Sequence, residues 1–476
     1  MSLNSRTVGQ RYIGANIFNM SINSRFAISL CIIIIIFSCS SSSEALQEYH
    51  VAVSGNDTQG KGSLQKPWRT IAYAVSKIRG GDIITIHQGS YQENSIGIFP
   101  SVSGSAQYPT TIRALEGERV IIYGVRSKAS DIYTIGVGAS HVLIEGLKIV
   151  GFSSIARGNE GGTLYIGGKA GHPCTDVKIK KCELTNSGPK LGGENPSIVV
   201  FNGTENCEIS NCRVYGSGKC DRAGIKIWRG TSKLLVQGNE VYNLLRRGID
   251  NKHGGRKRRL IIRDNYVHDV GALGIHVNSD NSLVENNVLY NCGEAGIGVW
   301  RNEGLPGGSY SILNHNTIVN CGRAGIYLGY GPAEDEGFRN CTVTNNIILN
   351  CSNREFAELT INPYGGRTPF NFGHIIDFNC YFNYRYLIVI RNRGSKFSLD
   401  QWQIFSGKDK YSIQQDPKLL GEPNNFKDIC DFQVSKQFSV SFSTPGDKVI
   451  GADIQNMKNC TNRLPPVPSN VRISTP

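Results

Sequence analysis

Apolar and polar residues alternate along much of the chain in short runs, and between Asp221 and Ser352 a run that opens with Gly-Ile occurs five times. The pair stands at Gly224-Ile225, Gly248-Ile249, Gly274-Ile275, Gly296-Ile297 and Gly325-Ile326. Short alternating segments bounded by polar turns predict β-strands rather than helices. This part of the chain is therefore predicted to be built from short strands.

Each repeat also contains a polar turn followed by a second short apolar stretch. One asparagine per repeat falls in the same column, at Asn239, Asn265, Asn287, Asn316 and Asn346. These residues recur at intervals of 22 to 30 residues, and a period of that size predicts stacked coils rather than separate domains. Asn tolerates a tight turn, and its amide can hydrogen-bond to neighbours above and below. We therefore predict that the five asparagines stack in one buried column.

The repeat resembles the right-handed parallel β-helix proteins of the pectate-lyase-like superfamily, whose coils often carry such an asparagine ladder. The segment from Tyr49 to Tyr91 resembles the N-terminal part of many bacterial β-helix proteins, in which a helix covers the open end of the apolar cylinder. Helical spacing is seen at Ile71, Ala74, Val75 and Ile78. The resemblance implies an all-β chain that forms a right-handed parallel β-helix (a solenoid) with an N-terminal capping helix.

Four regions are expected along the chain. Residues 1–39 are predicted to be an export signal with a candidate lipobox, 40–48 a spacer, 49–395 the parallel β-helix, and 396–476 a C-terminal closing segment and tail. The assignment of the β-helix follows the repeat and its resemblance. The first region depends on a separate signal near the N-terminus.

That signal is an apolar run from Phe26 to Phe37, preceded by Arg25. Such a run is too short to span a bilayer core of about 30 Å as a helix. A positive flank and a short apolar core are typical of an export signal. The end of the run resembles a bacterial lipobox with Cys39 as the lipidated residue, although ordinary signal cleavage near Ala45 is an alternative. We expect an exported protein, either secreted or held in the cell envelope (periplasm or cell surface), with membrane contact through a lipid anchor if Cys39 is modified.

Composition narrows the expected partners. The formal net charge is +13, and such an excess of positive charge favours polyanions. No nucleic-acid recognition motif is found, and an exported protein meets acidic polysaccharide first, so we expect an acidic polysaccharide and no nucleic acid. A monomer is expected.

Several of the 14 cysteines fall in register with the repeat. Regular spacing of this kind favours small buried thiols over a disulfide framework. The spacings do not match a zinc site. We expect no metal-ligating residues in the chain itself. The sequence identifies no cofactor, and Ca²⁺ is the candidate ion for a substrate carboxylate.

Side-chain alternation predicts which residues point away from the coil interior. If Ile in each Gly-Ile pair points inward, the next residue and the one two positions further point outward. Those positions are Lys226 and Trp228, Asp250 and Lys252, His276 and Asn278, Gly298 and Trp300, Tyr327 and Gly329. Coils stack about 4.8 Å apart, so these side chains are predicted to form one continuous, open face.

Two Trp and a Tyr beside cations are unusual on a solvated strand face. Aromatic rings stack on the apolar faces of sugars, while Lys and Arg bind their carboxylates. The candidate substrate-binding residues are Trp228, Arg229, Arg247, His253, Asn278, Trp300, Arg301 and Tyr327. The alternative is an ordinary decorated face with no ligand. The run Arg256 to Arg259 is more simply explained as a solvated basic turn.

Among reactions, β-elimination of a uronic-acid chain suits these residue types best. A cation neutralises the sugar carboxylate, and a base removes the acidic proton beside it. Lys252 is the candidate base and His276 the alternative base or acid. The predicted catalytic group consists of Lys252, His276, Asp250 and Lys226.

Three hypotheses for the function are consistent with the sequence. The favoured one is an exported polysaccharide lyase. The second is a non-catalytic polysaccharide-binding or cell-surface β-helix protein. A glycoside hydrolase or an epimerase is third, because hydrolysis usually needs two carboxyl groups about 5 to 9.5 Å apart and the predicted face carries one, Asp250.

Overall fold

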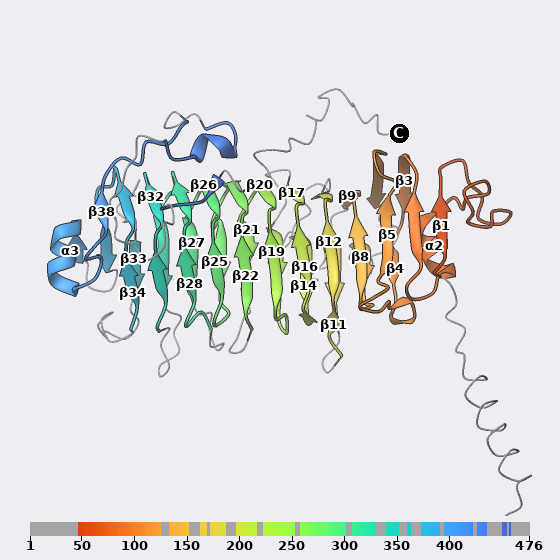
Figure 1. The fold of residues 1–476 in the computed structure, drawn as a ribbon, viewed down its shortest axis with the longest axis horizontal. Coiled ribbons are helices and arrows are strands. Elements are labelled where there is room, and N and C mark those ends of the chain that lie inside the picture. Colours follow the sequence, from red (N-terminus) through yellow and green to blue (C-terminus); the bar gives the residue numbers. More distant parts are fainter. Residues whose placement is uncertain are drawn as a thin grey trace, which may run out of the picture. The chain divides into compact units, whose positions relative to one another are not determined.

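The computed structural model describes residues 46–124, 133–151, 162–168, 172–186, 197–216, 222–252, 258–300, 307–329, 339–351, 359–362, 373–390, 395–421, 426–435, 450–454 and 457, with backbone alone at 300 and 359–362. Within these residues the strands form three sheets of twelve strands each (Figure 1). A typical coil contributes one strand to each sheet in turn, and we number the sheets in that order. The fold is the parallel β-helix that the repeat predicts.

The first sheet is built from β1 (Glu48–Val51), β2 (Ile83–Ile86), β5 (Thr110–Ala114), β8 (Val142–Glu145), β12 (Val177–Lys180), β16 (Glu208–Ser210), β19 (Leu234–Gln237), β22 (Leu260–Arg263), β25 (Leu283–Glu285), β28 (Ile312–Asn314), β31 (Thr342–Thr344) and β34 (Ile375–Asp377). The second sheet is built from β3 (Gly89–Glu93), β6 (Val120–Gly124), β9 (Lys148–Gly151), β13 (Glu183–Asn186), β17 (Arg213–Tyr215), β20 (Glu240–Leu244), β23 (Tyr266–Val270), β26 (Val288–Cys292), β29 (Thr317–Val319), β32 (Ile347–Leu349), β35 (Cys380–Phe382) and β38 (Ile413–Gln414).

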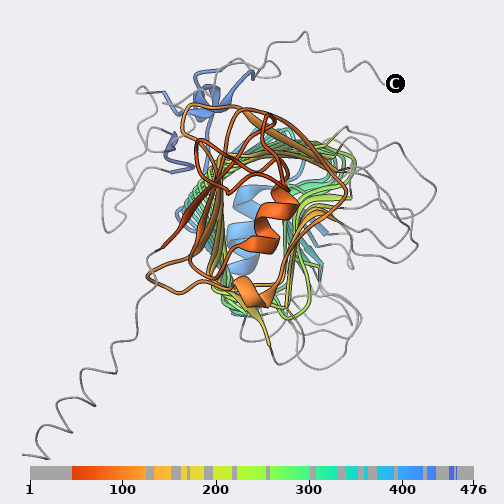
Figure 2. The same cartoon turned by 90° about the vertical axis from the view of Figure 1, so that its right-hand side faces the viewer.

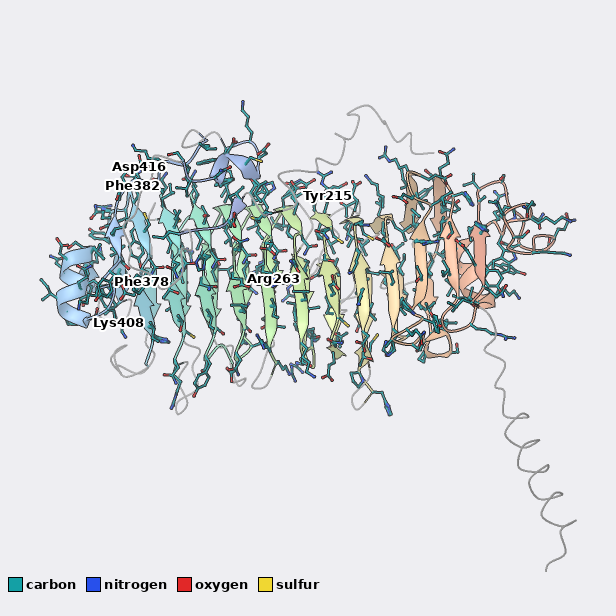
Figure 3. All side chains as sticks on the ribbon, in the orientation of Figure 1. Tyr215, Arg263, Phe378, Phe382, Lys408 and Asp416 are labelled. Atoms are coloured by element: carbon teal, nitrogen blue, oxygen red, sulfur yellow. The ribbon has the colours of Figure 1, made fainter. Side chains whose placement is uncertain are left out.

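The third sheet is built from β4 (Ile96–Ile98), β7 (Tyr133–Val137), β10 (Gly162–Gly167), β14 (Ser197–Asn202), β18 (Ala223–Ile227), β21 (Arg247–Asp250), β24 (Ile275–Val277), β27 (Ala295–Trp300), β30 (Ala324–Gly329), β33 (Leu359–Asn362), β36 (Ile388–Ile390) and β37 (Ser395–Phe397). A small pair, β11 (Cys174–Thr175) and β15 (Thr204–Glu205), lies beside the main sheets. The strands of the three sheets pair in parallel, except that β37 pairs antiparallel with β36. In Figure 3, Arg263 marks the first sheet, and Tyr215 and Phe382 mark the second sheet along the upper edge of the coils.

The turn from the first sheet to the second explains the asparagine column. It is two residues long, for example between Arg263 and Tyr266, and its first residue, Asp264, has a φ of 59°. The second residue, Asn265, is fully buried, and its Nδ2 donates to Asn287 Oδ1 in the next coil at 2.9 Å. A buried amide satisfied on both sides stabilises a turn that would otherwise leave backbone groups unpaired.

The predicted column is confirmed as a continuous ladder of side-chain hydrogen bonds. From Asn239 to Asn346 each Nδ2 donates to the Oδ1 of the next asparagine at 2.9 to 3.0 Å. The ladder continues one coil further than predicted, because Asn346 Nδ2 donates to Asn379 Oδ1 at 3.0 Å. In the opposite direction Cys212 takes the asparagine position, and its backbone N–H donates to Asn239 Oδ1 at 3.0 Å.

The cysteines of the coils are small buried side chains, as expected. Within the described part of the chain, nine are free and buried: Cys174, Cys182, Cys207, Cys212, Cys292, Cys321, Cys341, Cys351 and Cys380. Cys430, which lies outside the ladder, is disulfide-bonded. Thiols at interior positions fill the same role as small apolar residues.

A helix lies at each end of the apolar interior (Figure 2). Helix α2 (Ile71–Lys77) buries Ile71, Ala74 and Val75 against the first coils, and Thr70 caps it by accepting from the Tyr73 N–H. This confirms the predicted capping helix. At the other end α3 (Leu399–Ser406) begins with a capping box at Ser398 and ends at Gly407 in the left-handed conformation.

The C-terminal segment folds back over the outer face of the second sheet. The 3-10 turn η5 (Ile429–Phe432) buries Phe432 in a cluster with Val288 and Ile347, and Met457 joins the same cluster. Another 3-10 turn, η1 (Pro100–Val102), follows β4. Among the residues that the structure describes, we find no helix with the length and apolar character needed to cross a membrane. Cys39 and the predicted signal lie outside the described residues.

Candidate functional site

The five Gly-Ile pairs fall on neighbouring strands of the third sheet, β18, β21, β24, β27 and β30. All five isoleucines are fully buried in the central core. The glycine is required because a Cβ at Gly248 would lie 2.4 Å from Val267 Cγ1 and 2.5 Å from the Gly274 carbonyl oxygen. The glycine of each repeat thus stands where the backbone passes too close to the interior side chains for any larger residue.

The outward positions align in the predicted register. Lys226 pairs with Asp250, Asp250 with His276, His276 with Gly298, and Gly298 with Tyr327. Alternation along a strand is enough to place these residues in one column across the coils. The structure therefore brings together four of the predicted site residues that are up to 101 positions apart.

The expectation of an open face is wrong for most of this column. Lys226 is 2% exposed, and Asp250, His276 and Asn278 are 0% exposed. Alternation predicts that a side chain points away from the core, but it does not predict what covers that side chain. An outward position on this sheet is therefore not necessarily a solvated one.

Asp250, His276 and Arg247 form a buried polar network. Arg247 Nη1 donates to both oxygens of Asp250, at 2.9 and 3.1 Å. His276 Nδ1 lies 2.8 Å from Asp250 Oδ1. Burial alone would raise the pKa of Asp250, but the hydrogen bond from His276 and the charge of Arg247 hold that pKa well below its usual range.

The ionised Asp250 determines the state of the imidazole. Because a carboxylate can only accept, His276 must donate from Nδ1, which leaves the lone pair of a neutral ring on Nε2. Burial lowers the pKa of His276 more than the Asp250 carboxylate raises it. The ring is therefore neutral near pH 7 and oriented by its carboxylate partner.

Lys252 differs from this network because its side chain is half-buried rather than fully enclosed. Burial lowers the pKa of its ammonium, and the positive charges of Arg222, Arg247 and Arg246 lower it further, against the opposing effect of Asp250. Asn278 Nδ2 donates to the Lys252 carbonyl at 2.9 Å and so anchors the backbone there. A lysine with a depressed pKa among arginines is a candidate base beside an anion site.

Trp228 and Lys226 form a second contact on the same face. Lys226 Nζ lies 3.9 Å from the centre of the Trp228 ring, and the Arg229 guanidinium lies 5.9 Å from it. Trp228 is half-buried and Arg229 is exposed. A buried cation against one part of an indole holds that ring in place.

The remaining predicted binding residues divide between described and undescribed parts of the chain. Tyr327 is half-buried on β30, where its ring lies across Gly329. His253, Arg301 and the side chain of Trp300 lie outside the described residues.

Two contributions were missed by sequence reasoning. Arg222 lowers the pKa of Lys252, and Asn251 accepts from the Asn278 N–H and the Ser279 hydroxyl, each at 2.9 Å. A signal for the first was present, because Arg222 precedes Gly224 by the same two positions by which Arg246 precedes Gly248. No signal marked Asn251, which occupies the position of an inward-facing apolar residue.

Across the described residues, no group of three or more His, Cys, Asp and Glu side chains is arranged to hold a metal ion. The acidic side chain at the centre of the site, Asp250, is already engaged by Arg247 and His276.

Two family models match parts of the chain. A model described as "Right handed beta helix region" matches residues 135–306, and one described as "Protein of unknown function (DUF1565)" matches residues 53–106. The first covers the coils that contain the site. Together with the parallel sheets, it confirms the right-handed parallel β-helix predicted from the repeat.

A curated relative and several solved structures are also similar. The uncharacterized protein YwoF of Bacillus subtilis (strain 168) is 30% identical over 126 residues, which are 26% of this chain and 26% of that protein. The match thus spans about a quarter of that relative.

Among solved structures, XylC in complex with xylose has a TM-score of 0.48 at 14% identity, covering 78% of this chain and 87% of the other. A mannuronic-acid-specific family 6 polysaccharide lyase from human gut microbiota has a TM-score of 0.48 at 16% identity, covering 74% and 77%. The pectate lyase Pel9A has a TM-score of 0.41 at 14% identity, covering 73% and 78%. No residue role is carried over from these proteins.

Proposed function

Starting from a right-handed parallel β-helix of the pectate-lyase-like type, we propose that this chain is an exported, carbohydrate-active protein that cleaves a uronic-acid-containing polysaccharide by β-elimination. The observation that carries the proposal is Lys252, whose pKa is lowered by burial and by Arg222, Arg247 and Arg246. The same cations that favour the neutral, basic lysine also attract a carboxylated sugar chain. In this proposal Lys252 is the base, and the arginines around it form the site that binds the carboxylate.

The proposed reaction uses these groups as follows. Arginine side chains, Arg222 and Arg229 among them, neutralise the sugar carboxylate and so acidify the proton on the adjacent carbon. Neutral Lys252 takes that proton, and the electron pair forms a carbon–carbon double bond as the bond to the glycosidic oxygen breaks. The departing oxygen takes up a proton, and the products are an unsaturated uronate end and a new chain end.

The buried network has a positioning role in this proposal. His276 is 0% exposed and Lys252 is half-buried, which favours Lys252 over His276 as the group that reaches the sugar. Asp250 neutralises Arg247 and orients His276, and Lys226 holds the ring of Trp228. Trp228 then serves as a stacking surface for a sugar ring.

Hydrolysis fits the described residues less well. It usually needs two carboxyl groups about 5 to 9.5 Å apart, one of which stays protonated. Asp250 has a lowered pKa and is bound to Arg247 and His276. A carboxylate in that state is not suited to act as an acid.

The test is ultraviolet absorbance of unsaturated uronate products, measured across pectate, alginate and glycosaminoglycans, each with and without Ca²⁺. Absorbance on any one polymer supports a lyase. New reducing ends without absorbance would assign a hydrolase instead, and binding without any product would assign a non-catalytic binding protein.

The pH dependence provides a sharper prediction. Lys252 acts as a base only when neutral, so activity should rise as the pH passes its pKa. Arg222→Gln removes a positive charge that lowers this pKa, and the pKa of Lys252 should therefore rise. We expect the rising limb of the pH–rate profile to move to higher pH, and the high-pH plateau to fall, because Arg222 also neutralises the sugar carboxylate.

Arg259→Gln is the matched control, because Arg259 is exposed and is not among the groups that shift Lys252. Its profile should coincide with that of the wild type. An unchanged limb in Arg222→Gln would mean that a different group sets the pH dependence.

We also propose, on the sequence of the first 39 residues, that the protein is anchored to a membrane through Cys39. Cys39→Ser should move the protein from the detergent phase to the aqueous phase in a phase-partition assay of expressing cells. Cys31→Ser, within the same apolar run, is the control and should stay in the detergent phase. Equal partition of the two variants would favour ordinary signal cleavage.

A further inference from the structure

The third sheet carries aromatic rings on the N-terminal side of the site, and each lies across a glycine. A Cβ at Gly136 would lie 2.5 Å from Cε2 and Cζ of Tyr133. A Cβ at Gly167 would lie 2.2 Å from Cε1 of Tyr165. The rings therefore occupy the space where the side chain of an outward-facing residue would stand.

The same arrangement appears at β4, the first strand of this sheet, and at β30, beyond the site. The ring of Phe99 lies 2.9 Å from the Cβ position of Gly97, and the ring of Tyr327 lies 2.2 Å from that of Gly329. Glycine on a sheet surface leaves the backbone bare, and an aromatic neighbour commonly covers it. A ring that leans over the backbone in this way presents its other face outward.

These rings are in register with the candidate site. Gly97 pairs with Gly136, Gly136 with Tyr165, and Tyr165 with Val200. Val200 pairs in turn with Lys226, the first residue of the site column. The aromatic row and the site thus belong to one column on one sheet, with the fully buried Val200 of β14 between them.

The rings are positioned and partly accessible. Tyr133 and Tyr165 are half-buried, with ring centres 6.4 Å apart and planes within 23° of parallel. Asn202 Nδ2 donates to the Tyr165 hydroxyl at 2.8 Å, which fixes that ring. Phe99 is 65% exposed, so its ring is accessible to a ligand.

A purely structural role would be to cover bare backbone. That role explains one ring over one glycine, but it does not explain why rings of this kind lie in line with a cluster of cations and a tryptophan. Flat, partly exposed rings bind the apolar faces of pyranose rings, and a ligand that continues from the site must cross successive coils about 4.8 Å apart. The continuity of the row with the site therefore indicates a polymeric ligand.

Resting on the function proposed above, we propose that Phe99, Tyr133 and Tyr165 form a stacking platform that binds further sugar residues of the same polysaccharide. The chain lies along the coil axis over the third sheet, from β4 towards the site at β18 to β24.

The test compares long and short substrates. Tyr133→Ala and Tyr165→Ala should each raise KM for long polysaccharide by about three- to tenfold, the effect expected of one aromatic contact. The shortest oligosaccharide that is cleaved should show an unchanged KM, because it fills the site alone. Tyr108→Ala, at a 45% exposed tyrosine outside the third sheet, is the matched control and should behave as wild type.

Two further variants separate ring position from folding. Tyr165→Phe keeps the ring and should retain the affinity for long chains. Gly167→Ala keeps Tyr165 but displaces its ring, because the new Cβ would overlap it, and should weaken long-chain binding as Tyr165→Ala does. Circular dichroism and the Tm of each variant show that the coils are intact.

Calorimetric titration with long polysaccharide distinguishes this proposal from that of the lyase. If wild type binds without forming product and Tyr133→Ala weakens binding, the platform stands and the lyase fails. If product forms and the alanine variants match wild type on long chains, the platform is overturned and the lyase stands. Equal losses on long and short substrates would also overturn it, since they would place the rings within the central site.

Discussion

Lys252→Ala is expected to lower the rate of chain cleavage by about 10²- to 10⁴-fold, the usual effect of removing a general base. Binding of the polysaccharide should change little, because the arginines and Trp228 remain. The measurement is kcat from ultraviolet absorbance of the product, beside Kd from calorimetric titration of uncleaved chains. A large loss in kcat with a nearly constant Kd is the signature of a group that acts in the transition state.

Lys252→Arg sharpens this result. Arginine keeps the positive charge but cannot be deprotonated at accessible pH, so it should be as inactive as alanine. Lys178→Ala, at an exposed lysine on the first sheet, is the control and should keep wild-type kcat. Full activity in Lys252→Ala would place the base elsewhere, and a loss of binding without any product in wild type would support a binding protein.

Asp409→Ala is expected to destabilise the C-terminal end of the coils by about 3 to 5 kcal/mol. Its carboxylate is fully buried and accepts from Trp402 Nε1 at 2.8 Å, from the Tyr381 hydroxyl at 3.0 Å and from the Ser412 hydroxyl at 2.5 Å. It also ends the asparagine ladder, since Asn379 Nδ2 lies 3.5 Å from Asp409 Oδ1. Removing an acceptor shared by several buried donors costs about 1 to 3 kcal/mol for each donor that is left without one.

The C-terminal coils should lose stability before the rest of the solenoid, because each coil contacts mainly its neighbours. Hydrogen exchange should therefore accelerate first in β35, β38 and α3, and the calorimetric transition should shift downwards or split. Asp400→Ala, on the exposed first turn of α3, is the matched control and should change stability by a few tenths of a kcal/mol at most. Uniform exchange in both variants would show that Asp409 does not hold the end of the solenoid.

The asparagine ladder shows how far local pattern could predict the structure. Asn239 to Asn346 were placed correctly because each stands in a two-residue turn whose first residue has a positive φ. Asn379 belongs to the same ladder but follows Phe378, an unusual residue at a positive φ of 56°. The local signal was therefore lost, and the hydrogen bond from Asn346 reveals the position.

The register of the candidate site residues was predicted, but their solvent exposure and contacts were not. Lys226, Asp250 and His276 share a column because side chains alternate strictly along a strand. Their burial, the clamp of Arg247 on Asp250 and the proximity of Arg222 to Lys252 depend on which coils and connections meet there. Residue spacing does not encode the burial or the contact of Arg247 with Asp250, and for Arg222 it marks only a position two residues before Gly224.

The residue pattern was sufficient to predict the stacked coils, their register, the inward isoleucines, the helix at the N-terminal end and the column of chemically active residues. These features follow from short-range rules, namely strand alternation, the conformational needs of Gly and Asn, and the helical spacing of Ile71 to Ile78. Three features were visible only in the folded chain: Asp250 and His276 are enclosed while Lys252 is partly accessible, Asp409 closes the ladder, and the rings of Tyr133 and Tyr165 lie over glycines in line with the site. These depend on contacts between residues in different coils, where the length of each connection and the depth of each side chain set the solvent exposure and therefore the pKa and the available chemistry.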